Sequence, residues 1–172
     1  MSRIILITIC FFLCGSKVLC AKEIQYNFCN NHKFTFLLLD VYDVKLCTLQ
    51  KQKLRPETIY NENFSLVINY NMNFDKNELA KSSIKEINRY YDLESQEKNK
   101  FFDKLVLIFP DVKKGDVIEA NYNKDGHTSF YHNKNYRGSI DNERFSQIFL
   151  DIWLHKDNKY QKMVKNLFQI NE

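Results

Sequence analysis

Residues 114–155 read KGDVIEANYNKDGHTSFYHNKNYRGSIDNERFSQIFLDIWLH, and they decide the fold because strand, turn and helix patterns follow one another in order. Apolar and polar residues alternate over residues 117–122, which is typical of a β-strand with one buried face. Asp125 and Gly126 form a tight-turn pair, and residues 128–131 are rich in β-branched and aromatic side chains. This segment therefore predicts an antiparallel hairpin.

The same stretch continues through a second turn into a helix. Asn133 and Lys134 turn the chain, and a short strand around Tyr136 is predicted to end at Gly138. Asp141 is then expected to cap a helix. The apolar residues of this helix have helical spacing and are Phe145, Ile148, Phe149 and Ile152. Since such a stripe must be buried against another layer, the stretch predicts a β meander followed by a helix that lies on the sheet.

The chain before this stretch predicts three more strands. A first strand over residues 24–28 is expected to turn at residues 30–32, where the sequence is Asn-Asn-His. A long strand over residues 34–48 follows, and its unbroken apolar run FTFLLL indicates burial on both faces. Apolar and polar residues alternate over residues 64–70, which predicts a half-exposed strand.

Three further helices are predicted around the meander. Asp75 or Asn77 is expected to cap the first, which carries an apolar stripe opposed by charged residues. The second begins near Ser95 and stops before Pro110, and the last begins at about Lys159. The sum is an antiparallel sheet with its helices on one face, which is an α+β arrangement.

Four blocks of this chain occur in an order that matches a known family. FTFLLLDVYDVKL at residues 34–46 contains a V-Y-D motif, and NELA at residues 77–80 precedes an amphipathic run. FPDVKKGD follows at residues 109–116, and the meander of residues 114–155 ends in FLDIWL. Together they resemble the bacterial chalcone isomerase-like proteins, a secreted branch of the chalcone isomerase superfamily, over nearly the whole chain after residue 20. The resemblance implies an open-faced β-sandwich, in which helices cover one face of a curved antiparallel sheet and a ligand lies in the cleft between them.

The first residues have the pattern of a secretory signal peptide. Arg3 precedes an apolar run over residues 4–13, polar residues follow at 15–17, and residues 18–21, Val-Leu-Cys-Ala, offer a cleavage site. We therefore expect residues 1–20 to be a signal peptide and residues 21–172 to be one domain, periplasmic or secreted, with no stable membrane span after cleavage. The alternatives are a retained membrane anchor and a lipoprotein signal, the latter at Cys14 or Cys20.

Charge and cysteine content narrow the expected partners. The chain has 25 Lys and Arg residues against 21 Asp and Glu, and two of the cations, Arg3 and Lys17, fall in the leader. The lysines alternate with acids, so neither a nucleic-acid partner nor an anionic membrane patch is indicated. Cys29 and Cys47 remain after the leader, and an even pair in a secreted protein favours a disulfide. A turn at residues 30–32 would hold them apart, so two buried thiols are expected, with a bridge as the open alternative.

No general catalytic signature is present in the sequence. It lacks a nucleophile elbow, a phosphate-binding glycine loop, HExxH and CxxC. The histidines at positions 32, 127, 132 and 155 are spread over turns and element ends, so we expect no metal site and no cofactor. No catalytic residue is assigned.

The resemblance implies candidate ligand-binding residues. Fatty-acid-binding relatives use an arginine and a tyrosine to hold a carboxylate, and plant chalcone isomerases have a threonine at the tyrosine's position. Tyr42 matches the tyrosine, and Lys33 stands where many bacterial members carry arginine. Lysine lacks arginine's planar fork, so weaker anion binding is expected. Tyr91, on the apolar stripe of its helix, is the third candidate.

Three functions remain open. The first is a non-catalytic binder of a small apolar or amphipathic molecule such as a fatty acid, and the second is an isomerase of the chalcone-to-flavanone type. The third is a periplasmic interaction protein, with an unknown protein partner, whose cleft is filled by its own side chains. Those side chains would include Phe36, Leu38, Phe145, Phe149 and Trp153. Trp153 is expected at the centre of the contact between helix and sheet rather than in a binding site.

Overall fold

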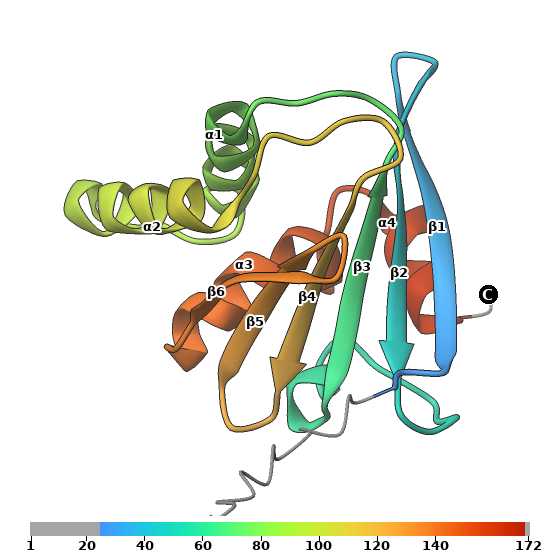
Figure 1. Ribbon diagram of the computed structural model, residues 1–172. Coiled ribbons are helices and arrows are strands. Elements are labelled where there is room, and N and C mark those ends of the chain that lie inside the picture. Colours follow the sequence, from blue (N-terminus) through green and yellow to red (C-terminus); the bar gives the residue numbers. More distant parts are fainter. Residues whose placement is uncertain (1–24, 171–172) are drawn as a thin grey trace, which may run out of the picture.

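The computed structural model describes residues 25–170, so the predicted leader lies outside the described residues. One antiparallel sheet of six strands runs in the order β1-β2-β3-β4-β5-β6, and Figure 1 shows α3 and α4 behind it. The strands are β1 Phe28–Phe36, β2 Leu39–Thr48, β3 Phe64–Tyr70, β4 Val117–Asn123, β5 His127–His132 and β6 Asn135–Ile140. The helices are α1 Lys76–Ile87, α2 Ser95–Ile108, α3 Glu143–Leu154 and α4 Gln161–Phe168, with a 3-10 turn η1 Ile59–Asn61. This is the predicted α+β open-faced sandwich.

The predicted meander from β4 to α3 is confirmed, with two corrections. Gly126 has φ +96, and an added Cβ there would approach Glu143 Cβ to 2.7 Å, so this turn requires glycine. β6 continues through Gly138 and ends at Ile140 rather than at the glycine. The residue that caps α3 is Asn142, not Asp141, because the Asn142 side chain accepts the backbone N–H of Phe145.

The first hairpin differs from its prediction. β1 runs straight through the Asn-Asn-His segment at residues 30–32, and the chain turns instead at Leu37 and Leu38. The apolar run that indicated a doubly buried strand is therefore the tip of a hairpin. This register places Cys29 directly opposite Cys47, with their Cα atoms 4.0 Å apart, and the two form a disulfide. The expectation of two separate thiols is wrong because it rested on the misplaced turn.

The helical layer follows the sequence signals more closely. Of the two candidate caps for α1, the structure selects Asp75, which forms a capping box with Glu78. α2 begins at Ser95 and ends at Ile108, two residues before Pro110, as predicted. α4 begins at Gln161, and its buried residues are Met163, Val164, Leu167 and Phe168.

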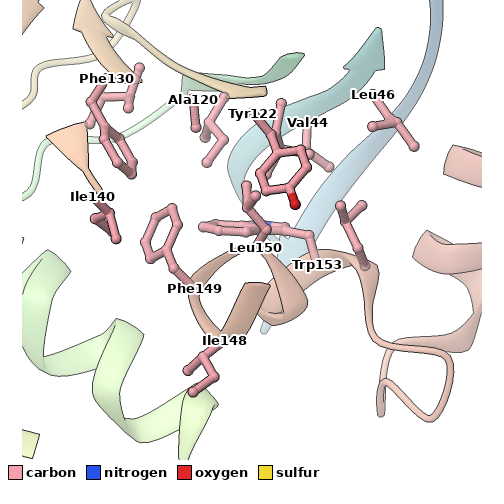
Figure 2. Packing of buried hydrophobic residues seen from close by; sticks show 14 of the residues in the cluster. Val44, Leu46, Ala120, Tyr122, Phe130, Ile140, Ile148, Phe149, Leu150 and Trp153 are labelled. Carbon is pink, nitrogen blue, oxygen red and sulfur yellow. The ribbon is translucent and has the colours of Figure 1, made fainter. Parts of the chain in front are cut away.

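The core lies between the sheet's inner face and α3, as Figure 2 shows. Alternation along β3 and β4 directs Phe64, Leu66, Ile68, Tyr70, Ile118, Ala120 and Tyr122 inward. Phe149 packs edge-to-face against both Phe130 and Trp153. Trp153 is 7% exposed, which confirms its predicted burial at the contact between helix and sheet.

Candidate ligand-binding cavity between sheet and helices

A cavity of about 390 Å³ lies between the sheet and the helices. Its walls come from the inner faces of β1 to β4, from α1 and α3, and from the loop that follows β3. Most of its lining is aliphatic or aromatic. A volume of this size falls within the range of about 300–1,000 Å³ that small-molecule sites occupy, and such sites combine apolar walls with a few polar groups.

The side chains that the third reading, an interaction protein, placed inside this cleft do not fill it. Phe36, Phe149 and Trp153 line the cavity as wall residues. Phe145 packs against Phe101 of α2 with ring centroids 5.0 Å apart, and Leu38 is fully exposed at the hairpin tip. Trp153 is thus a core residue that also lines the cavity, and its lack of a role in ligand binding stays a prediction.

Tyr42 lies on the cavity wall with its hydroxyl held in a fixed position. Its ring stacks on Phe34 at 4.8 Å between centroids, and its hydroxyl accepts a hydrogen bond of 3.1 Å from Trp153 Nε1. Burial raises the pKa of the Tyr42 phenol well above its ordinary value, so the group stays protonated. Within residues 25–170, no acceptor is bonded to that proton, so Tyr42 can donate it to a ligand.

Tyr70 provides a second hydroxyl that the sequence reasoning missed as a site residue. It pairs with Tyr42 across β2 and β3, and the two ring centroids are 6.4 Å apart. Burial raises the pKa of the Tyr70 phenol, so this group is a neutral donor as well. The signal for it was available, because strand alternation places Tyr70 on the same face as Phe64, Leu66 and Ile68.

Among the residues that the structure describes, one cation and one acid line the cavity, and both come from α1. Glu86 is already paired, since its carboxylate binds Arg89 Nε at 2.8 Å and Lys159 Nζ at 3.1 Å. Lys85 is exposed, and no acidic partner for its ammonium lies within the described part of the chain. The cavity therefore has one uncompensated positive charge, at Lys85, a residue that no sequence motif singled out.

Lys33, the cation implied by the resemblance, is placed elsewhere. It follows the alternation of β1 onto the face opposite Phe34, whereas Phe34 lines the cavity. Its ammonium is exposed and binds Asp40 Oδ2 at 2.8 Å, which raises the pKa of Lys33. Of the three residues predicted from the sequence, the structure thus places only Tyr42 on the cavity wall.

Tyr91 belongs to a separate buried cluster centred on Asp151. Tyr60 donates a hydrogen bond of 2.5 Å to Asp151 Oδ1, and Tyr91 donates to Asp151 Oδ2. Burial raises the pKa of the Asp151 carboxyl, and the two phenol donors act in the opposite direction. Burial and the nearby Asp151 carboxylate also raise the pKa of Tyr60. None of these three residues lines the cavity.

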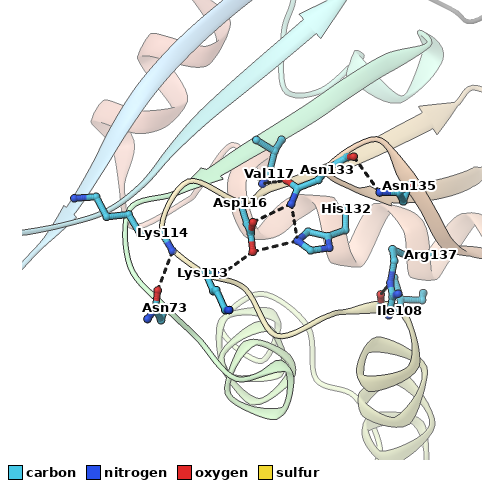
Figure 3. Close-up of polar contacts among 10 residues, drawn as sticks. All are labelled: Asn73, Ile108, Lys113, Lys114, Asp116, Val117, His132, Asn133, Asn135 and Arg137. Carbon is cyan, nitrogen blue, oxygen red and sulfur yellow. Dashed lines mark hydrogen bonds and ion pairs between the residues drawn. The ribbon is translucent and has the colours of Figure 1, made fainter.

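Polar side chains also gather where β4 begins, as Figure 3 shows, and none of the residues drawn there lines the cavity. Asp116 lies 3.2 Å from His132 Nε2 and accepts a hydrogen bond of 2.8 Å from Asn133 Nδ2. That bond is the main reason why the pKa of Asp116 is lowered. Asn133 also accepts the backbone N–H of Val117, so the cluster fixes the β5–β6 turn against β4. Within residues 25–170, no group of three or more His, Cys, Asp and Glu residues is arranged to hold a metal ion.

A second hollow, of about 910 Å³, lies beside α4 and the loop of residues 51–57. Its lining includes Lys51, Lys53, Arg55 and Lys156, so it is more polar than the cavity. No helix in the described range is long and apolar enough to cross a membrane.

Comparisons with known proteins agree with this geometry. Residues 33–168 match the family model described as chalcone isomerase-like. No curated protein matches the sequence at a significant level. The crystal structure of the Arabidopsis thaliana fatty-acid binding protein AtFAP1 is similar, with a TM-score of 0.57 and 9% sequence identity over 81% of this chain and 83% of that chain. At 9% sequence identity, this similarity shows a shared fold and nothing further.

Proposed function

This chain belongs to the chalcone isomerase-like family, and from this premise we propose that it binds a small apolar molecule with an anionic head group, such as a fatty acid, without catalysing a reaction. The observation that carries the proposal is the cavity of about 390 Å³, in which the Tyr42 hydroxyl has a proton to donate and no protein acceptor within the described residues. The similar fold of a fatty-acid binding protein supports it.

The polar groups of the cavity include hydrogen-bond donors that a carboxylate can accept from. Tyr42 and Tyr70 remain protonated because burial raises the pKa of each phenol, so each can donate a hydrogen bond. Hydrogen bonds to a charged acceptor are stronger than neutral ones. Lys85 adds a positive charge that no acid in the described chain neutralises, while the apolar walls accept the hydrocarbon chain.

The isomerase alternative is less well supported by the same site. The resemblance implies a threonine where this chain has Tyr42, and an arginine that holds the substrate. No arginine is among the described residues that line the cavity, and Lys33 faces the other side of the sheet. The missing arginine weakens both readings, because the fatty-acid-binding relatives also use one, so it is Tyr42 in place of threonine that favours binding over ring closure.

The proposal includes a periplasmic or secreted location and membership of the secreted bacterial branch. The leader pattern of residues 1–20 supports export. The Cys29–Cys47 disulfide supports an oxidising compartment, since structural disulfides persist there. Mass spectrometry of the native protein tests this part: an N-terminus near Ala21 is expected, and an intact Met1 would contradict export.

The binding proposal is tested by calorimetric titration with palmitate. Tyr42→Phe removes one hydroxyl from the cavity and should weaken binding by about 10- to 100-fold, because a hydrogen bond to a charged group is worth roughly 1.5–3 kcal/mol. Tyr131→Phe is the matched control, since Tyr131 lies on the outer face of the sheet against Tyr136. The absence of saturable binding to the wild-type protein, or equal losses in both variants, would contradict the proposal.

A further inference from the structure

The tip of the β1–β2 hairpin is made of four consecutive exposed apolar side chains. Phe36 is 54% exposed, Leu37 79%, Leu38 101% and Leu39 55%. Figure 1 shows this tip projecting well beyond the ends of the other strands. Burial of large apolar side chains is favourable, so four neighbours left in solvent at a protruding point are costly for a protein that meets only water.

The backbone of the tip is unfavourable for its residues as well. Leu37 has φ 48 and Leu38 φ 67, a left-handed conformation that asparagine and glycine adopt more readily than leucine. The β5–β6 turn has nearly the same angles, φ 48 and φ 69, and there the first position is Asn133. The chain thus uses a favourable residue in one turn and leucines in the other. Neither the exposure nor the conformation of these leucines stabilises the folded domain, which points to a role outside it.

The tip is continuous with the candidate cavity. Phe36 and Leu39, the two outer residues of the tip, line the cavity together with Phe34 and Val41 of the same hairpin. An apolar surface therefore runs from the cavity wall along Phe36 and Leu39 to the exposed Leu37 and Leu38.

We propose that this hairpin tip inserts into the surface of a lipid bilayer, so that an apolar ligand passes between the bilayer and the cavity along Phe36 and Leu39. The proposal rests on the proposed function and names the source of the ligand. A ligand that moves along this path exchanges one apolar surrounding for another, and its hydrocarbon chain avoids water throughout.

A bilayer fits the tip better than a protein partner does. A stable protein interface takes about 20–30 residues from each side, whereas the tip presents four residues on a convex point. A bilayer needs no matching concave surface. Next to the tip, Lys33 and Asp40 form an ion pair of 2.8 Å, so the adjoining charges largely cancel. Insertion therefore depends on the apolar side chains, and a zwitterionic bilayer is sufficient.

The test measures how strongly the protein partitions into vesicles of phosphatidylcholine. The protein is expressed as the full chain and purified after its natural processing in the cell. The double variant Leu37→Asn/Leu38→Gly places in the turn the residue pair that its backbone favours, so its thermal midpoint should equal or exceed that of the wild type. Its partition constant should fall by about tenfold or more, since each leucine loses its favourable burial in lipid. Leu107→Gln is the matched control, because Leu107 is an equally accessible leucine on α2, 76% exposed.

Each outcome decides the matter. A selective loss in the double variant supports the proposal, and an unchanged partition constant or an equal loss in Leu107→Gln overturns it. Another outcome is that the wild type forms a dimer and fails to bind vesicles, and that only the double variant loses the dimer. That result would assign the tip to an interface with a second copy of the chain, and it would also overturn the proposal. Palmitate titration without vesicles tests ligand binding separately from docking to the bilayer. Retained ligand binding with failed docking overturns only this inference, whereas docking without ligand binding overturns the proposed function.

Discussion

Lys85 and Lys33 are both exposed lysines, but only Lys85 lines the cavity. Lys85→Gln should weaken palmitate binding by about 1.4- to 5-fold, because charge pairs at exposed positions contribute roughly 0.2–1 kcal/mol. Lys33→Gln removes a charge that Asp40 already pairs on the other face of the sheet, so it should leave the affinity unchanged. The measurement is the palmitate dissociation constant at low salt. If Lys33→Gln lost more palmitate affinity than Lys85→Gln, then Lys33, the cation that the family resemblance implies, would be the residue that binds the anion.

Asp151 is the buried acid whose protonation should affect the stability of the fold. Burial raises the pKa of its carboxyl above the unfolded value of about 3.9. Between the unfolded and the folded pKa, the folded protein holds a proton that the unfolded chain has released. The Asp151 contribution to stability should therefore fall as the pH rises through this window and stay constant above it.

Asp151→Asn removes the ionisable group while leaving an acceptor for Tyr60 or Tyr91. We compare the free energy of unfolding of the wild type with that of the variant. The wild-type value minus the variant value should decrease as the pH rises from about 4 towards neutrality. Urea unfolding at a series of pH values measures this difference. A difference that does not change with pH would show that burial does not raise the pKa of Asp151.

Single residues of the site were predictable only where a motif or a resemblance pointed to them. Tyr42 was found because it stands in the V-Y-D motif, and the structure places it on the cavity wall. Tyr91 was chosen from a helical stripe, but its hydroxyl binds Asp151. Lys85 has no local signal, because its role depends on how α1 packs over the sheet and on Glu86 being paired by Arg89 and Lys159.

At the scale of elements, local turn chemistry determines which strands could be predicted. The turn at Asp125 and Gly126 has a residue pair that the backbone requires, so β4 and β5 were placed correctly. The first hairpin turns at two leucines, and the asparagines that normally mark a turn lie inside β1 at residues 30 and 31. No propensity rule identifies that turn, because the pairing of β1 with β2 overrides local preference.

The correct register of this hairpin has a consequence for stability. Cys29 and Cys47 join two paired strands across 18 residues of sequence, and β1 is the edge strand of the sheet. Cys29→Ser/Cys47→Ser should destabilise the domain by about 2–4 kcal/mol, since the cross-link restricts the unfolded chain. For a chain of this size, the thermal midpoint should fall by about 4–16 °C.

Thermal unfolding of the double serine variant, alongside the wild type with and without reductant, measures this effect. The reduced wild type should unfold near the temperature of the variant. If reduction and substitution both leave the midpoint unchanged, then the bridge does not hold β1 in the sheet.

At the scale of the whole molecule, the predicted architecture is confirmed, because long-range organisation follows from features that the sequence shows strongly. Apolar alternation in β3 and β4 requires one covered face, and the stripes of α1, α2 and α3 provide the layer that covers it. Residues 33–168 match the chalcone isomerase-like family model, so nearly all of the described chain takes part in this architecture. The cavity could not be predicted from patterns of single elements, since it depends on the fit between the two layers.

This arrangement joins three features that lie far apart in the sequence. α1 carries Lys85, β2 carries Tyr42, and α3 carries Trp153, which holds the Tyr42 hydroxyl in place. The hairpin tip adds an exposed apolar surface that continues from the same cavity. We propose that these parts form one binding site for an apolar chain with a carboxylate head.

The most direct test of this claim is a crystal structure of the protein saturated with a long-chain fatty acid that carries bromine at its terminal carbon. We expect the anomalous signal of bromine inside the cavity and the carboxylate within about 2.5–3.0 Å of the Tyr42 hydroxyl oxygen. A cavity closed by its own aromatic side chains, or bromine bound only outside the layer between sheet and helices, would contradict the claim.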